Sequence, residues 1–80
     1  MAAVELFKNL GYELLETSDF IFYQKNISNY LVNEHFILIR FDKNEQTFFA
    51  EEQSYSNIQE HEITVNEFRA IQTQIKELGW

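Results

Sequence analysis

The sequence predicts one α+β domain over residues 1–80, with a helix at each end and an antiparallel sheet of three to five strands between them. Apolar residues recur with helical spacing at both ends, and the only two glycines, Gly11 and Gly79, stand where these segments should stop. The segments between them are short, rich in aromatic and β-branched residues, and separated by polar residues. Because one face of such a sheet must be covered, we expect the C-terminal helix to pack on it.

The first expected element is a helix over residues 2–10. Ala3, Leu6, Phe7 and Leu10 have the spacing of one helical face. Gly11 follows directly and can adopt the left-handed conformation that ends many helices.

Four segments are expected to be strands, over residues 12–16, 20–25, 35–42 and 46–51. The third is the most distinct, because its apolar run is typical of a central strand or of one covered on both faces. Residues 51–62 are acidic and polar, and we expect a loop there that can hold a short edge strand near its end.

The strand over residues 35–42 also predicts self-association. Phe36 and Leu38 alternate with Ile37, Ile39 and Phe41, so the two sets point to opposite faces. Two short helices cover only one face, and we therefore expect a second copy to cover the other in a homodimer.

The C-terminal helix has a complete set of start signals. Thr64 and Glu67 have the spacing of a capping box, in which each side chain bonds to the other residue's backbone N–H. Ile63 and Phe68 flank this box at the spacing of a hydrophobic staple. The apolar stripe expected to enter the core is Phe68, Ile71, Ile75 and Leu78.

The same helix has matching stop signals. Gly79 is expected at the C′ position, and Trp80 at C″ can then pack back on Ile75, as in a Schellman motif.

Composition and charge exclude several functional classes. The absence of cysteine excludes disulfides, thiolate metal sites and a cysteine nucleophile, and favours a reducing compartment. No secretory signal and no membrane-spanning run is recognisable, so we expect a cytoplasmic protein. The net charge is −7, and no Lys or Arg occurs between Lys43 and Arg69. Such a field repels phosphate backbones, so direct nucleic-acid binding is not expected.

The acidic segment is the main candidate site. Its interpretation remains open between a solvated face and a contact surface for a basic protein, which could mimic a phosphate backbone. The residues expected to form that surface are Glu45, Glu51, Glu52, Glu60 and Glu62.

No residues are expected to be catalytic, to bind a cofactor or to hold a metal. His35 and His61 both adjoin acids but lack metal-site spacing, so solvated side chains are expected. No Gly-flanked nucleophilic serine and no phosphate-binding Gly loop occurs. The many Phe and Tyr residues are expected to build the core, since a base-stacking surface needs flanking bases.

Six short segments carry a resemblance to a known family, and they are Leu10-Gly11-Tyr12-Glu13, Ile39-Arg40-Phe41-Asp42, Thr47-Phe48-Phe49, Ile63-Thr64, Glu67-Phe68-Arg69-Ala70-Ile71 and Glu77-Leu78-Gly79-Trp80. In these segments the chain resembles a family of small acidic proteins encoded by phages and prophages of low-GC Gram-positive bacteria. The resemblance implies a mobile-element setting and a cytoplasmic location, and it carries no active-site residues.

Three functions therefore stand open at this stage. The first is a non-catalytic phage accessory protein that binds a host or phage protein. The second is an acidic inhibitor that occupies the nucleic-acid-binding groove of a host protein. The third is a small enzyme, which would need a pocket lined by perturbed titratable groups.

Overall fold

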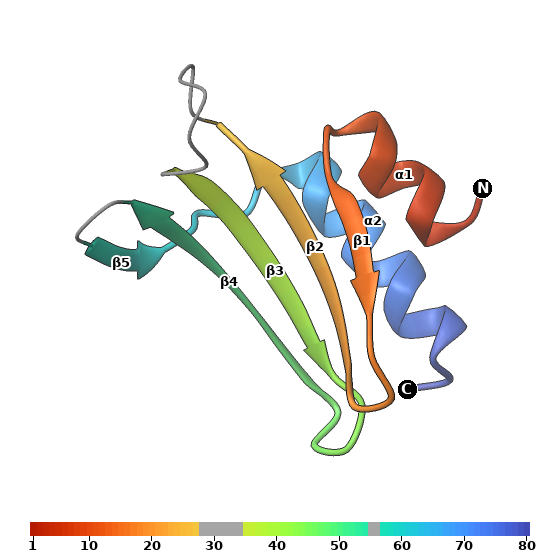
Figure 1. Cartoon of the computed structure of the whole chain (residues 1–80). Helices are drawn as coiled ribbons and strands as arrows, with labels where there is room; N and C mark the ends of the chain where they lie inside the picture. The colour runs from red at the N-terminus through yellow and green to blue at the C-terminus, as the bar shows by residue number, and fades with distance from the viewer. Residues whose placement is uncertain (28–34, 55–56) are drawn as a thin grey trace.

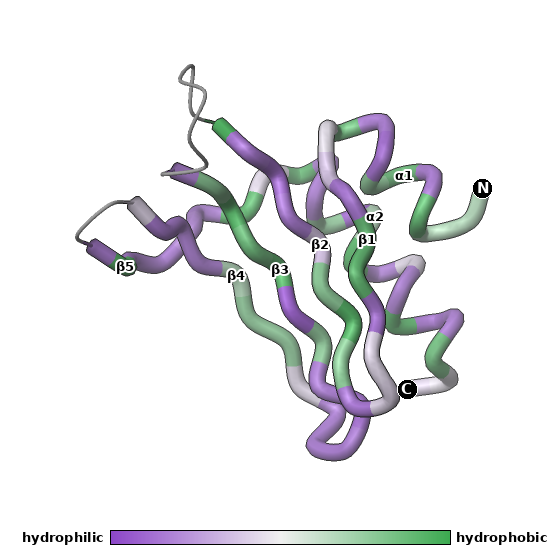
Figure 2. The backbone as a smooth tube through the Cα atoms, in the orientation of Figure 1, coloured by the Kyte–Doolittle hydropathy of each residue, from purple (hydrophilic) through white to green (hydrophobic). Residues whose placement is uncertain are grey.

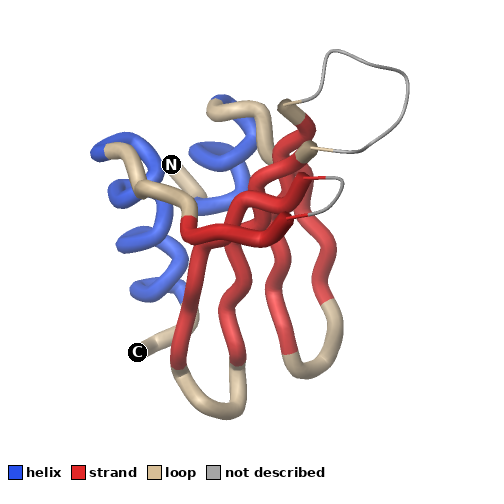
Figure 3. Tube along the Cα trace, turned by 90° about the vertical axis from the view of Figure 1, so that its left-hand side faces the viewer, coloured by secondary structure: helices blue, strands red, loops and turns tan. Residues whose placement is uncertain are grey.

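The fold has two layers, a five-stranded antiparallel sheet and a pair of helices on one of its faces (Figures 1 and 3). The computed structural model describes residues 1–27, 35–54 and 57–80. The predicted α+β class is confirmed, with a helix at each end of the chain. The elements are α1 (Ala3–Asn9), β1 (Glu13–Glu16), β2 (Phe20–Asn26), β3 (Phe36–Asp42), β4 (Thr47–Ser54), β5 (Asn57–Glu60) and α2 (Val65–Glu77).

The strands lie in the sheet in their order along the chain, β1-β2-β3-β4-β5. Each strand therefore pairs antiparallel with its neighbours in sequence, and the two edges are the four-residue strands β1 and β5. Gln46, in the turn from β3 to β4, has a φ of 55°.

Residues 51–62 differ most from the prediction. Glu51 to Ser54 extend β4 where a loop was expected, and Asn57 to Glu60 form β5 beside them, in agreement with the short edge strand that was allowed for near the end of this segment. Polar side chains are tolerated here because this end of the sheet is not covered and neighbouring side chains bond to one another. Gln59 donates to Glu52 across the hairpin, and Gln53 donates to Glu51 along β4. Figure 2 shows the contrast between the mainly hydrophilic β5 and the mainly hydrophobic β3. Residues 55–56 lie outside the described residues.

Both helices end in Schellman motifs, as Gly11 and Gly79 predict. The two glycines have φ angles of 94° and 77°. The Trp80 N–H bonds to the Ile75 carbonyl at 3.2 Å, and the Tyr12 N–H bonds to the Phe7 carbonyl at 2.9 Å. Each glycine thus reverses the chain direction directly after its helix. After α1 the chain enters β1, and after α2 Trp80 packs against the core.

The core lies between the helices and the sheet. Phe7 of α1 is fully buried and stacks on Tyr23 of β2, with ring centroids 3.8 Å apart. The two helices pack on each other, and the Ala3 N–H bonds to the Glu77 carboxylate at 2.8 Å. The buried apolar residues are Ala3, Phe7, Tyr12, Ile21, Tyr23, Ile37, Ile39, Phe41, Ala70 and Ile71.

The apolar stripe of α2 is rotated relative to the prediction. Ile71 is buried and Ile75 and Leu78 pack against the core, but Phe68 is 49% exposed. The buried position one residue earlier is Glu67, which takes part in the hydrogen-bonded cluster described below. Among the described residues, no helix has the length and apolar character needed to cross a membrane.

Candidate functional site

The candidate site is the face of the sheet that the helices leave open. Side chains alternate between the two faces of a strand, and those of Ile37, Ile39 and Phe41 on β3 are buried beneath the helices. Phe36 and Leu38 therefore point to the open face, as predicted from their alternation. Figure 3 shows both helices on one side of the strands. No described element covers the other side.

One row of side chains crosses this open face directly opposite one another. We call it the aromatic row, and it places Arg40 between two phenylalanines on the neighbouring strands. Its members are Leu15 on β1, Phe22 on β2, Arg40 on β3 and Phe49 on β4.

Arg40 is the one charged side chain of the aromatic row. Its guanidinium lies over the ring of Phe49 at 4.2 Å and over the ring of Phe20 at 5.0 Å. These cation–π contacts hold the side chain flat against the sheet. Its Nε is buried and has no hydrogen-bond partner within the described part of the chain. The aromatic row thus presents an oriented cation with one unused donor.

A second row lies two residues further along the strands, at a spacing of about 6.6 Å. We call it the polar row, and it consists of Glu13, Gln24, Leu38 and Glu51. Its carboxylates stand on β1 and β4, on either side of the two strands that carry Gln24 and Leu38, so the open face has a positive centre and negative flanks.

The position of four phenylalanines corrects the expectation that the aromatic residues build the core. Phe20, Phe22, Phe36 and Phe49 belong to the open face and are only partly buried. The sequence did not separate them from the core because both faces of β2 and β3 carry apolar residues, so hydrophobicity does not alternate there.

A second cluster, centred on Glu67, is buried beneath α2. Its carboxylate accepts hydrogen bonds from the Thr64 N–H at 2.8 Å and from the Tyr12 hydroxyl at 2.5 Å. His61 Nε2 lies 2.9 Å from the same carboxylate, so this nitrogen carries the proton, because a carboxylate only accepts. The predicted capping box is confirmed, since the Glu67 N–H also bonds to the Thr64 hydroxyl at 3.1 Å.

Burial and hydrogen bonding act in opposite directions on Glu67. Burial alone would raise the pKa of this carboxyl group, but the donors from Thr64, Tyr12 and His61 together lower it below 4.5. Burial raises the pKa of the Tyr12 hydroxyl, and the bond to the Glu67 carboxylate raises it further. The cluster therefore holds an ionised carboxylate and a neutral phenol, which fixes the start of α2 against the chain that enters β1.

His61 is thus not the solvated side chain that was expected, since only 12% of it is exposed. Its neighbours Glu60 and Glu62 suggested a solvent-facing position, but its actual partner, Glu67, lies on the following helix. His35 is closer to the expectation, with 41% of its side chain exposed and Nε2 3.5 Å from Glu52.

The five acids proposed as a partner surface do not form one ridge. Glu51 belongs to the polar row, whereas Glu52 follows it on the strand and points to the opposite face. Glu45 lies in the turn at the other end of β4, and Glu62 lies between β5 and α2. Only Glu51 and Glu60 are direct neighbours, as register partners on β4 and β5.

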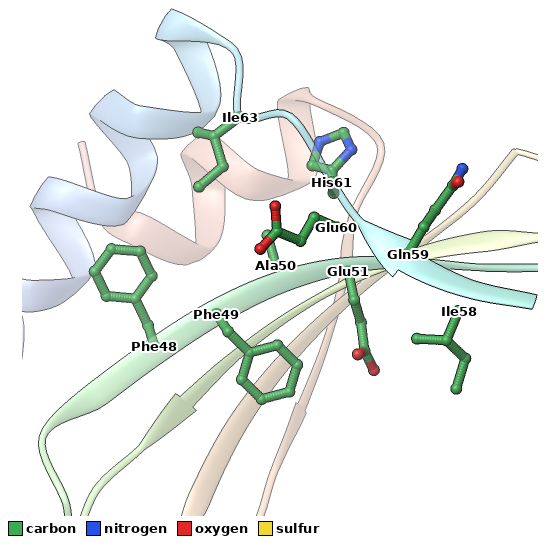
Figure 4. A pocket seen from close by; sticks show the side chains of 9 residues that line it. All are labelled: Phe48, Phe49, Ala50, Glu51, Ile58, Gln59, Glu60, His61 and Ile63. Carbon is green, nitrogen blue, oxygen red and sulfur yellow. The ribbon is translucent and has the colours of Figure 1, made fainter.

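Beside this pair, a hollow of about 580 Å³ lies where β5 leaves β4 (Figure 4). Figure 4 shows Phe48 and Ile63 on the helix side, Phe49 and Glu51 on the opposite side, and the Glu60 carboxylate beside Ala50. Its walls combine apolar side chains with the carboxylates of Glu51 and Glu60.

No group of three His, Asp or Glu residues in the described ranges is arranged to hold a metal ion. Comparison of the chain with protein-family models, with curated proteins and with solved structures finds no match. Function must therefore be inferred from the side chains of the sheet and helices.

Proposed function

We propose that this chain is a non-catalytic binding protein whose open sheet face takes up a protein partner. The observation that carries the proposal is the aromatic row, an uncovered band of apolar side chains centred on Arg40. Aromatic residues and arginine dominate the energy of protein interfaces, because they bury much surface and keep a polar handle. Arg40 as a whole is only partly buried, so its guanidinium gives the partner a charged contact for a carbonyl or carboxylate oxygen.

The charges around this row favour a partner with basic residues at its periphery. Glu13 and Glu51 flank the aromatic centre, and the chain as a whole has a net charge of −7. Such a field would speed encounter with a basic protein and oppose binding of a phosphate backbone. The resemblance to phage and prophage proteins suggests a host or phage protein in the bacterial cytoplasm as this partner.

The other two functions have less support. A nucleic-acid mimic needs carboxylates along one surface, and here they are divided between both faces and both ends of β4. In the buried cluster around Glu67, the carboxylate is occupied by the donors of Thr64, Tyr12 and His61, which gives it a structural role at the start of α2.

Site-specific photocrosslinking tests the proposal. A photoreactive amino acid replaces Leu15 on the open face, and the matched control carries it at Val65 on α2, because the two residues are 65% and 67% exposed. Both variants are expressed in cells that naturally produce the chain, and the crosslinked species are identified by mass spectrometry.

The expected result is one dominant protein adduct from position 15 and none of comparable yield from position 65. The adduct should disappear when Arg40→Met is added. Equal adducts from both positions, or a nucleic-acid adduct at position 15, would contradict the proposal.

A further inference from the structure

A second surface lies along the groove between β4 and α2, and it adjoins the open face at Phe49 and Glu51. Two hollows, of about 580 and 610 Å³, adjoin there and share Phe48 in their walls. Phe48 rests on Phe41 of the core, with ring centroids 5.7 Å apart, yet 39% of it remains exposed. Phe68 in the second hollow and Ile63 in the first are also largely uncovered. The groove is therefore apolar along its floor.

The two hollows have opposite charge. Glu51 and Glu60 line the first, whereas Arg69 and Lys76 line the second. Arg69 and Lys76 are seven residues apart on α2, which places them on the same helical face. In residues 1–27, 35–54 and 57–80, none of Glu60, Arg69 and Lys76 forms an ion pair. The groove thus has an acidic half and a basic half that meet at Phe48.

We propose that this groove pairs with a second copy of the chain about a two-fold axis near Phe48. A two-fold axis exchanges the halves, so the acidic half of each copy faces the basic half of the other. Glu60 of one copy then meets Arg69 of the other, twice in the dimer, and the exposed rings of Phe48 and Phe68 are buried between them.

The pattern favours a second copy over an unrelated protein because it is complementary to itself. The open sheet face lacks this property, since its polar row has carboxylates at both ends and Arg40 at the centre is unique. The sequence led to a dimer in which a second copy covers the open face. The dimer proposed here uses the groove instead, and the open face stays free for the partner proposed above. Phe49 and Glu51 border both surfaces, but the tests use different residues, Arg40 for the partner and Glu60 with Arg69 for the dimer, so the two proposals can fail separately.

A charge exchange between copies gives a sharp test by sedimentation equilibrium. Glu60→Lys sets two cations against each other at both contacts, and Arg69→Glu sets two carboxylates against each other at both. Each variant alone should raise the dimer Kd at least about tenfold. An equimolar mixture of the two should recover association, because both contacts of the mixed dimer join opposite charges. At one contact the new lysine at position 60 faces the new glutamate at position 69, and at the other the unaltered Glu60 faces the unaltered Arg69. The double variant, in which each contact again joins opposite charges, should recover wild-type association.

The matched controls are Glu45→Lys and Lys8→Glu, which make the same charge changes at exposed positions outside the groove. They should leave the Kd within about twofold of the wild-type value, and circular dichroism verifies that every variant is folded. A wild-type chain that stays monomeric at millimolar concentration would overturn the proposal. Single variants that dimerise as well as the controls, or a double variant that stays monomeric, would overturn it too.

Discussion

Replacement of Tyr12 by phenylalanine isolates one hydrogen bond of the Glu67 cluster. The hydroxyl donates to the Glu67 carboxylate at 2.5 Å, and both residues are buried. The ring itself is kept, together with its edge contact to Phe7 at a centroid distance of 5.6 Å. Hydrogen bonds to charged groups contribute about 1.5–3 kcal/mol. We expect the free energy of unfolding at pH 7 to fall by that amount, which corresponds to a drop in Tm on the order of 10 °C.

The pH dependence distinguishes this bond from a general packing defect. Because the folded pKa of Glu67 lies below its ordinary value of 4.5, the unfolded state binds more protons in the acid range. This contribution to stability is fully present above pH 4.5 and is lost as the pH falls through the pKa that Glu67 has in the folded state. Tyr12→Phe removes one of the donors that lower the pKa of Glu67. The variant should therefore lose less stability between pH 4.5 and acid pH than the wild type, and this loss should be complete at a higher pH.

Urea unfolding followed by circular dichroism, from pH 2 to pH 7, measures both effects. A double-mutant cycle with Glu67→Gln then gives the coupling energy between the two side chains. A Tyr12→Phe variant within about 0.5 kcal/mol of wild type, or with an unchanged acid limb, would refute the view that this bond holds an ionised carboxylate.

Three further predictions concern the core and the helix cap. Burial, assisted by nearby carboxylates, raises the pKa of the Tyr23 hydroxyl to about 12. The neutral hydroxyl therefore stabilises the fold fully below pH 10, and this stabilisation should be lost as the pH rises through 12. A urea midpoint that does not change between pH 10 and pH 12 would contradict this prediction. Phe7→Ala should cost about 3–5 kcal/mol in chemical denaturation, because the side chain is fully buried against Tyr23. Thr64→Ala should cost about 0.5–2 kcal/mol by the same assay through loss of the bond from the Glu67 N–H; an unchanged midpoint would mean that this bond adds no stability.

The elements fixed by local sequence were the most predictable. A capping box, a glycine at C′ and a helical apolar stripe each lie within a few residues of one another, so α1 and α2 could be placed to within about two residues. The same holds for β3, where the two-residue repeat of a strand correctly assigns side chains to the two faces of the sheet.

β5 and the polar half of β4 could not be predicted equally well, because their side chains resemble those of a loop. Strand pairing there depends on neighbours such as Glu51 and Glu60 that meet only after the hairpin has formed. Hydrophobic patterning signals burial, and these residues are paired without being buried.

The candidate site also depends on contacts that sequence spacing does not encode. Arg40 was visible as a charge within an apolar strand, which was the one available signal, but its place between Phe20 and Phe49 follows from the register of three strands. Likewise, the partner of His61 is set by the path of the chain between β5 and α2. The five proposed acids were close in sequence, yet strand alternation and the length of β4 disperse them.

The edge strands of the sheet influence whether copies of the chain aggregate at high concentration. An uncovered aromatic face invites stacking, and unpaired strand edges invite endless sheet growth. Here both edge strands have only four residues, β1 begins and ends with glutamate, and β5 ends at Glu60. Short, charged edges offer few backbone groups to an added strand and repel an identical one. The short, charged edge strands therefore disfavour growth of the sheet by added copies at both ends.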